Sequence, residues 1–361
     1  MAKFSDDEHW VALSLIPGLG GETYRRLLRA FGEPREIFAA SQSALKKVVS
    51  DKIAAAIREG GDREAAAAAA AWLTEPGNSL MTLADPDYPP GLLQIPDPPP
   101  LLYVKGRREL LGRPALAVVG SRNATPQGIR NAQSLARSLS DSGFCIVSGL
   151  ALGIDAAAHE GGLAGASGSV AVVGTGLDVV YPARNRTLAR ELAERGALLS
   201  EYPLGTRALA GNFPRRNRLI SGLAAGCLIV EAAIQSGSLI TARLAAEQGK
   251  EVFAIPGSIH SPLSKGCHAL IKQGAKLVES ARDILEELGA PLPVESDIVP
   301  FAEGSGAGDR LLAQLGFEVC DVDTLAQGSG LTAEQVCSML LKLELEGRVA
   351  SLPGGRYQRI G

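Results

Sequence analysis

Four arginines are concentrated in a part of the sequence that contains no acidic residue. No Asp or Glu lies between positions 201 and 231, whereas the same stretch contains Arg207, Arg215, Arg216 and Arg218. Pro214 is typical of a first helical turn, and a helix start attracts anions through its dipole and free amide groups. This pattern predicts a polyanion site in which Phe213 stacks on an unpaired base and Asn217 binds a base edge. The alternative is a solvated charged helix face, which the expected lack of acidic partners for the arginines disfavours.

Two further turns have the residue types of phosphate-binding loops. The segment Gly120-Ser121-Arg122 follows one apolar run, and Ser236-Gly237-Ser238 follows another. If each lies at a helix start, its backbone amides and hydroxyl groups face an incoming phosphate, and Arg122 adds a cation. Together with the arginine cluster, the two turns predict a track for several phosphates. The alternative is that the two segments are ordinary strand-to-helix turns that bind no ligand.

No constellation in the sequence indicates catalysis. Asp155 and His159 are four residues apart on an alanine-rich helix, but no nucleophile or second carboxylate accompanies them, which favours a packed, hydrogen-bonded histidine over a general base. The phosphate-binding pattern G-x-x-x-x-G-K-[ST] is absent. The four His and five Cys show no zinc spacing, and no carboxylate cluster resembles a two-metal site. We therefore expect neither metal nor cofactor, and no enzymatic activity.

The overall charge favours no polyanion, because the net charge is −3 and the isoelectric point is about 5.9. Any nucleic-acid site must therefore concentrate its positive charge locally. The N-terminus lacks the features of a secretory signal, and no apolar stretch is long enough for a membrane span. The five cysteines are scattered and form no C-x-x-C pair, and three of them lie inside apolar runs, which is typical of reduced core residues. These features predict a cytoplasmic protein without membrane contact.

The central part of the sequence predicts the fold class, an α/β protein with an extended Rossmann-like, doubly wound parallel sheet. From residue 115 onward, short apolar runs alternate with segments of helical periodicity. The predicted strands are 115–119, 145–148, 170–173, 197–200, 227–231, 251–255 and 276–278. The predicted helices are 126–141, 155–164, 186–195, 214–224, 238–248, 266–273 and 281–288.

The sequence divides into four predicted parts. Residues 1–74 read as helical, with Pro17-Gly-Leu-Gly-Gly21 either as the turn of a helix-hairpin-helix (SAM-like) domain or as a plain helical hairpin. Residues 75–289 form the Rossmann-like domain and begin with a proline-rich extended connection. Residues 290–308 are a flexible linker. Residues 309–361 are winged-helix-like, and the few cations on the helix predicted at 332–347 favour a protein-contact or purely structural role over DNA contact.

The motifs of the central domain resemble those of the DNA processing protein A (DprA/Smf) family. The matching segments include Val119-Gly-Ser-Arg122, Ser200-Glu-Tyr-Pro203, Phe213-Pro-Arg-Arg-Asn-Arg218, Ser236-Gly-Ser-Leu-Ile-Thr241 and Phe253-Ala-Ile-Pro-Gly257. The resemblance implies a homodimer that binds single-stranded DNA (ssDNA) without hydrolysing it and loads the RecA-type recombinase during natural transformation. The implied ssDNA contacts are Gly120, Ser121, Arg122, Phe213, Arg216, Asn217, Arg218 and the 236–238 loop, and Arg215 extends the arginine cluster.

Two departures from the family pattern lower the positive charge of the predicted site. Leu152 stands where the family usually has Arg, and Gln235 stands where Arg or Lys is more common. The main alternative function is that of a nucleotide phosphoribohydrolase of the lysine-decarboxylase-like type. That family has the pattern P-G-G-x-G-T-x-x-E after a strand, whereas this chain has Glu231-Ala-Ala-Ile-Gln-Ser-Gly-Ser at that place. A third alternative is an interaction scaffold whose binding site has decayed, but the intact arginine cluster argues against it.

Overall fold

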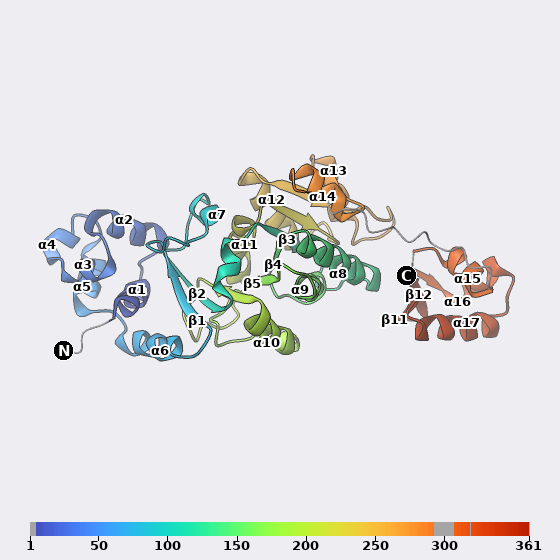
Figure 1. The fold of residues 1–361 in the computed structure, drawn as a ribbon, viewed down its shortest axis with the longest axis horizontal. Coiled ribbons are helices and arrows are strands. Elements are labelled where there is room, and N and C mark those ends of the chain that lie inside the picture. The colour runs from blue at the N-terminus through green and yellow to red at the C-terminus, as the bar shows by residue number, and fades with distance from the viewer. Residues whose placement is uncertain (1–4, 292–306, 318, 361) are drawn as a thin grey trace.

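The computed structural model describes residues 5–291, 307–317 and 319–360. A helical N-terminal segment, a central sheet with helices on both faces and a small C-terminal module follow one another along the long axis (Figure 1). The fold class predicted from the sequence is confirmed. No helix in the described part of the chain is long and apolar enough to cross a membrane.

The described N-terminal residues form six short helices, four of which begin at a side-chain cap. Ser5 caps the first helix in a reciprocal capping box with Glu8, and Ser41, Ser50 and Asp62 accept hydrogen bonds from backbone amides at later helix starts. The helices are α1 (Asp6–Ser14), α2 (Gly21–Phe31), α3 (Pro34–Ala39), α4 (Gln42–Leu45), α5 (Asp51–Glu59) and α6 (Arg63–Leu73).

The central sheet has nine strands in the order β1-β2-β6-β5-β4-β3-β7-β8-β9. The seven strands β3 to β9 run parallel, as predicted, and their ends differ from the predicted ones by at most two residues. They are β3 (Ala115–Val119), β4 (Cys145–Ser148), β5 (Ser169–Val172), β6 (Ala197–Ser200), β7 (Gly226–Ile229), β8 (Glu251–Ala254) and β9 (Lys276–Leu277).

The proline-rich segment is more than the predicted extended connection. It contributes β1 (Asn78–Thr82) and β2 (Leu101–Gly106), an antiparallel pair that joins the sheet where β2 pairs with β6. The prolines lie outside both strands, in the loops and in the short helix α7 (Pro90–Leu93). Because proline removes a ladder hydrogen bond only where it stands, neither strand is interrupted.

Helices cover both faces of the sheet. On one face, a core of residues such as Leu219, Ala242 and Cys267 lies under α11 (Asn212–Leu223), α12 (Ser238–Glu247) and α13 (Lys265–Lys272). On the other face, a second core that includes Ala136 and Ile154 lies under α8 (Pro126–Asp141), α9 (Ile154–Ala164) and α14 (Ala281–Glu287). The helix α10 (Arg186–Arg195) packs beside α9 and β6.

The N-terminal helices share one hydrophobic core with the antiparallel edge of the sheet. Trp10 and Leu13 of α1 belong to the same buried cluster as Leu80 of β1 and Tyr103 of β2. Trp72 of α6 contacts Tyr103 edge-on, with ring centroids 6.0 Å apart. The helical segment therefore covers one face of the β1–β2 pair.

The C-terminal module is a winged helix with its own core and a three-stranded sheet in the order β10-β12-β11. Its elements are α15 (Ala307–Leu315), β10 (Val319–Asp321), α16 (Val322–Ser329), α17 (Ala333–Leu345), β11 (Val349–Leu352) and β12 (Arg356–Arg359). The sequence did not predict β10. The predicted linker 290–308 lies mostly outside the described residues, and its last two residues begin α15.

The winged helix contacts the central domain at α8. The guanidinium of Arg130 donates hydrogen bonds to the carbonyl oxygens of Gly347 and Ile360, at 2.8 and 2.9 Å. The backbone amide of Gln127 donates to the side-chain oxygen of Gln358 at 3.4 Å. The first two turns of α8 therefore hold the module.

Candidate nucleic-acid interface

A groove of about 760 Å³ opens at the carboxyl ends of β3 and β7. From β3 the chain builds β4, β5 and β6 on one side and then crosses to β7 on the other side. This reversal is the topological switch point at which open α/β sheets bind ligands. Nine of the residues predicted for the site line the groove: Gly120, Ser121, Arg122, Phe213, Arg216, Asn217, Ser236, Gly237 and Ser238.

The loop after β3 does not present its amides as expected. The amide of Ser121 donates to the carbonyl oxygen of Glu231 at 2.7 Å, and the amide of Gly120 hydrogen-bonds the buried carboxylate of Asp155. The helix α8 begins only at Pro126, after the Thr125 cap, so this loop is not a helix start. The loop instead offers the exposed side chain of Arg122 to the groove.

Phe213 forms an aromatic wall of the groove together with two neighbours. Its ring contacts Tyr181 with centroids 5.6 Å apart, and the Arg122 guanidinium carbon lies 5.9 Å from its centroid. Phe213 is half-buried, so part of its surface is available to a ligand. An aromatic ring beside an arginine is a suitable platform for a base with an adjacent phosphate.

The sequence did not indicate Tyr181. It lies in the long loop after β5, is 48% exposed and lines the groove. Its approach to Phe213 depends on how that loop folds across the start of α11, which local periodicity does not reveal. The available signal was an aromatic residue in a loop that follows the carboxyl end of a parallel strand.

Arg216 lies beneath the groove rather than on its rim. Its side chain donates to the carbonyl oxygens of Gly149, at 2.8 Å, and Val172. Burial lowers the pKa of Arg216 to about 10, and the neighbouring Asp155 opposes this shift. The Nε atom of Arg216 is buried and has no hydrogen-bond partner among the described residues. This arginine therefore places a fixed positive charge under the floor of the groove.

Arg215 and Arg218 do not line the groove, and both have acidic partners. Arg218 contacts Glu201 at 2.7 Å and Asp97 at 3.5 Å, while Arg215 contacts Glu201 at 3.4 Å. The expectation that the cluster lacks counter-acids was therefore wrong, because Glu201 stands at the end of the acid-free stretch and Asp97 comes from the proline-rich segment. Burial raises the pKa of Glu201, and the two arginines oppose this shift.

The other predicted residues that line the groove carry no charge. The side-chain amide of Asn217 makes no hydrogen bond with any residue of the described segments and is half-buried at the groove wall. The Ser236 and Ser238 hydroxyl oxygens lie 2.7 Å apart, and Gly237 is the N-cap of α12. This loop therefore places two hydroxyl groups at a genuine helix start, as predicted.

His159 is a packed histidine, as the sequence favoured. It is fully buried, its Nδ1 lies 2.7 Å from the Ser169 hydroxyl, and its Nε2 accepts the amide of Leu150 at 3.2 Å. Because burial lowers its pKa to about 3, the imidazole is neutral at physiological pH. Asp155 does not pair with it but accepts backbone amides from Gly149 and Ala151.

The carboxylates nearest the groove are occupied by hydrogen bonds within the protein. Asp155 holds the backbone at the floor, and Glu231 accepts hydrogen bonds from the amide and hydroxyl of Thr125, at 2.9 and 2.6 Å. Burial raises the pKa of both carboxyl groups. Across the residues whose placement is described, no three His, Cys, Asp or Glu side chains are grouped to hold a metal ion.

Comparison with known proteins supports a single family. Residues 79–289 match the family model of DNA recombination-mediator protein A, and residues 300–355 match that of the DprA winged helix domain. Protein Smf of Escherichia coli is 41% identical over 98% of this chain and 96% of its own length. The DNA processing protein DprA of Streptococcus pneumoniae is 48% identical over 57% of this chain and 73% of its own length.

Solved structures agree with these sequence matches. The crystal structure of DNA processing protein A from Streptococcus pneumoniae matches with a TM-score of 0.70 and 35% identity, over 81% of this chain and all of that chain. A structure that describes the ssDNA binding mode of the Helicobacter pylori protein matches with a TM-score of 0.53 and 33% identity, over 58% of this chain and 95% of that chain.

The fold and the matched models define a DNA-processing protein built on a Rossmann-like sheet with an appended winged helix. The chain belongs to the DNA processing protein A (DprA/Smf) family.

Proposed function

We propose that this protein binds ssDNA in the groove at the β3–β7 switch, without catalysing a reaction on it. The observation that carries this proposal is the platform of Phe213 and Tyr181 beside Arg122, at the mouth of a groove with the buried Arg216 beneath it. Such a platform needs an unstacked base, whereas the cations alone would attract any polyphosphate. The ssDNA binding described for the Helicobacter pylori relative supports the same function.

The position of each residue in the groove determines the role that we propose for it in ssDNA binding. Arg122 is exposed and contacts phosphates, Phe213 and Tyr181 stack on bases, and Asn217 with the 236–238 hydroxyl groups binds base edges or phosphate oxygens. Arg216 stabilises the bound phosphates electrostatically through the groove floor. Because the groove holds only a few cations, binding is expected to weaken with added salt along a shallow slope.

The geometry favours a binding protein over a nucleotide phosphoribohydrolase. A hydrolase needs an acid or base that reaches the substrate, but Asp155 and Glu231 already accept hydrogen bonds from the protein backbone and from Thr125. A nucleotide-release assay with nucleoside monophosphates tests this preference. Release of the free base by the purified protein would favour the hydrolase.

The proposed function is tested by fluorescence anisotropy with matched ssDNA and duplex over a salt series. Phe213→Ala is expected to cost about 1–3 kcal/mol of ssDNA binding and far less of duplex binding, so the strand preference narrows. A melting curve of the same variant is the control. A large fall in melting temperature with an unchanged strand preference would make Phe213 a structural residue and contradict the stacking role.

We also propose a homodimer formed at the β7–β9 end of the sheet. Ile234 and Ile259, in the loops after β7 and β8, are 67% and 66% exposed. Leu277 of β9, which pairs in register with Ala254, is 45% exposed. Large apolar side chains at one sheet end are typical of an interface. Leu277→Arg should convert a dimer into a monomer in sedimentation, and an unchanged dimer would place the interface elsewhere.

The biological role proposed for this binding is the loading of a RecA-type recombinase onto incoming ssDNA during natural transformation, in the cytoplasm. The match to a recombination-mediator family supports this role. The test is the ssDNA-dependent ATPase of the recombinase on ssDNA already covered by a single-strand-binding protein. The wild-type chain should shorten the lag, and Arg122→Ala should do so less effectively.

A further inference from the structure

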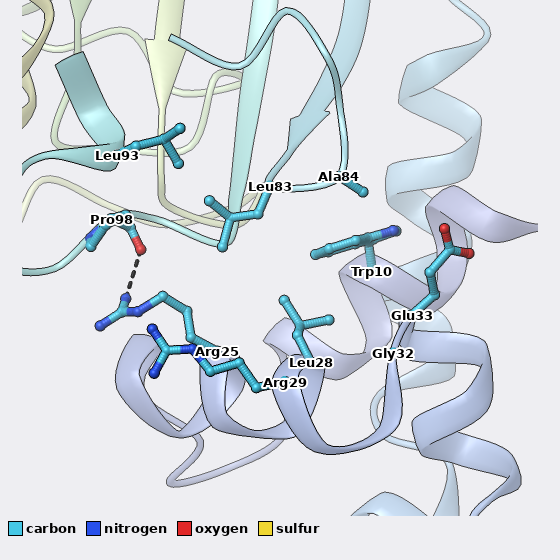
Figure 2. Close-up of a pocket in the computed structure, with 10 residues that line it drawn as sticks. All are labelled: Trp10, Arg25, Leu28, Arg29, Gly32, Glu33, Leu83, Ala84, Leu93 and Pro98. Atoms are coloured by element: carbon cyan, nitrogen blue, oxygen red, sulfur yellow. Dashed lines mark hydrogen bonds between the residues drawn. The ribbon is translucent and has the colours of Figure 1, made fainter. Parts of the chain in front are cut away.

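A second cavity lies between the N-terminal helices and the proline-rich segment (Figure 2). Its volume is about 450 Å³, and it shares no lining residue with the groove at β3 and β7. Its walls come from α1, α2, the loop after β1 and the region of α7. Any ligand in this cavity is therefore separate from the proposed ssDNA site.

The cavity walls are largely apolar and remain partly open to solvent. Trp10 and Leu28 form the side that belongs to the helical segment, and Leu83 and Leu93 form the opposite side (Figure 2). Leu93 is 53% exposed, although it lies on a helix that packs against the sheet domain. An indole ring and three leucines around one opening resemble the apolar centre of a protein-docking site.

Two arginines, Arg25 and Arg29, line one end of this cavity. Arg25 is held by the carboxylate of Asp97 and the carbonyl oxygen of Pro98, both at 2.7 Å. Arg29 lies one turn further along α2, is exposed, and has no acidic partner within the described chain. Glu33 lines the cavity at the far end of α2, away from the two guanidinium groups (Figure 2). The charge of Arg29 is therefore uncompensated beside an apolar opening.

We propose that this cavity docks an acidic, amphipathic peptide segment of a partner protein. A bulky apolar side chain of the segment enters between Trp10 and Leu93, and a carboxylate one helical turn away pairs with Arg29. Arg25 is already fixed by Asp97 and Pro98, so it shapes that end without losing side-chain freedom on binding. The charge asymmetry along α2 sets the direction of the segment, with its acidic end at Arg29 and away from Glu33.

The test uses the full-length chain and a fluorescent helical peptide of about 14 residues that carries Leu and Phe one turn apart and two Glu on the preceding turn. Anisotropy should detect binding, and a peptide with Lys in place of Glu should bind at least about tenfold more weakly. Arg29→Glu and Leu93→Ser should each weaken binding of the Glu peptide by about tenfold. Bound ssDNA should not displace this peptide, because the two cavities share no lining residue.

Arg35→Glu is the matched control. Arg35 is exposed on α3 and lies outside the cavity, and its substitution makes the same charge change as Arg29→Glu. This variant should bind the Glu peptide like the wild type. Equal loss in Arg35→Glu and Arg29→Glu would reveal only general electrostatic attraction and overturn the proposal. Absence of peptide binding would overturn it too. If Leu93→Ser instead turns a dimer into a monomer in sedimentation, the cavity belongs to an interface with a second copy, which also overturns it.

Discussion

Arg122 and Arg216 both line the groove, but they differ in what holds them. Arg122 is exposed and touches the Phe213 ring, whereas Arg216 is 5% exposed and donates to the backbone carbonyls of Gly149 and Val172. An exposed cation acts mainly on a charged ligand, and its removal leaves the fold intact. Removal of a buried donor leaves its acceptors unsatisfied. Substitution of Arg122 should therefore affect ssDNA binding more than stability, and substitution of Arg216 should lower the stability of the fold.

Arg122→Ala should weaken ssDNA binding for all sequences and lower the magnitude of the salt slope by about one unit or less. Its unfolding free energy in urea should stay close to that of the wild type. Arg216→Met should lower the unfolding free energy by about 1–3 kcal/mol, because the carbonyl oxygens of Gly149 and Val172 lose their donor. If Arg216→Met proves as stable as the wild type, the buried hydrogen bonds are not what fixes this side chain.

His159 makes stability depend on pH in a defined direction. Its pKa is lowered from 6.5 to about 3 by burial, so the unfolded chain binds a proton more readily than the folded chain. The contribution of the neutral imidazole is fully present above about pH 6.5 and is lost as the pH falls towards 3. Between about pH 7 and pH 5, the wild type should lose more unfolding free energy than His159→Asn.

The pKa values of the Asp155 and Glu201 carboxyl groups shift in the opposite direction to that of His159. Burial raises the pKa of both carboxyl groups, so protonation in acid favours the folded state and partly offsets the effect of His159. Equal acid sensitivity in the wild type and in His159→Asn would show that other groups control the pH dependence.

At the scale of elements, α11 has two functional faces. Phe213, Arg216 and Asn217 point to the groove, while Arg218 pairs on the other side with Glu201, with side chains 12% and 5% exposed. Asp97 lies between Arg218 and Arg25 of α2, so the helix is also joined to the N-terminal segment. The orientation of the groove face is thus set by ion pairs on the opposite face.

Arg218→Ala should destabilise the protein by about 3–5 kcal/mol, since it leaves the buried Glu201 carboxylate without its main partner. Because Arg218 does not line the groove, the salt slope of ssDNA binding should change little. The double variant Arg218→Met with Glu201→Leu should recover much of the stability, as well-packed apolar pairs replace buried ion pairs. If Arg218→Ala flattens the salt slope of ssDNA binding without loss of stability, Arg218 belongs to the DNA-binding surface.

The same elements show how far the sequence could predict the structure. The strands β3 to β9 were predictable because parallel strands buried on both faces are continuous apolar runs. The strands β1 and β2 were hidden by surrounding prolines, although none lies within either strand. The rotation of α11 was not predictable, because it depends on Asp97, which is 121 residues from Arg218 in sequence. Nine groove residues were predicted from their types, whereas Tyr181 and the division of α11 into two faces were not.

At the scale of the molecule, the two terminal modules are attached in different ways. The winged helix has its own core and meets α8 mainly through hydrogen bonds of Arg130 and Gln127. The N-terminal helices share their core with β1 and β2. A boundary drawn at residue 74 from composition therefore crosses a continuous hydrophobic core, whereas one drawn near residue 290 does not.

A chain that ends at residue 291 should fold and bind ssDNA nearly as well as the full chain, because the groove lies wholly before that point. A chain that begins at residue 75 should be much less stable and prone to aggregation, since Leu80, Leu101 and Tyr103 become exposed. Circular dichroism melting and ssDNA anisotropy on both truncations measure this. If both truncations melt like the full chain, the shared core contributes little to stability.

The position of the groove at the switch point also determines when during synthesis the protein can first bind DNA. The segments that follow β3 and β7, from which both sides of the groove are built, are joined by the Thr125–Glu231 hydrogen bonds, which span 106 residues. The strand β3 gains its neighbour β7 only after β4, β5 and β6 have been made. Contacts of such long sequence separation form late and slowly. A nascent chain on the ribosome therefore has no ssDNA site until α12 has emerged, by which time most of the sheet is already complete.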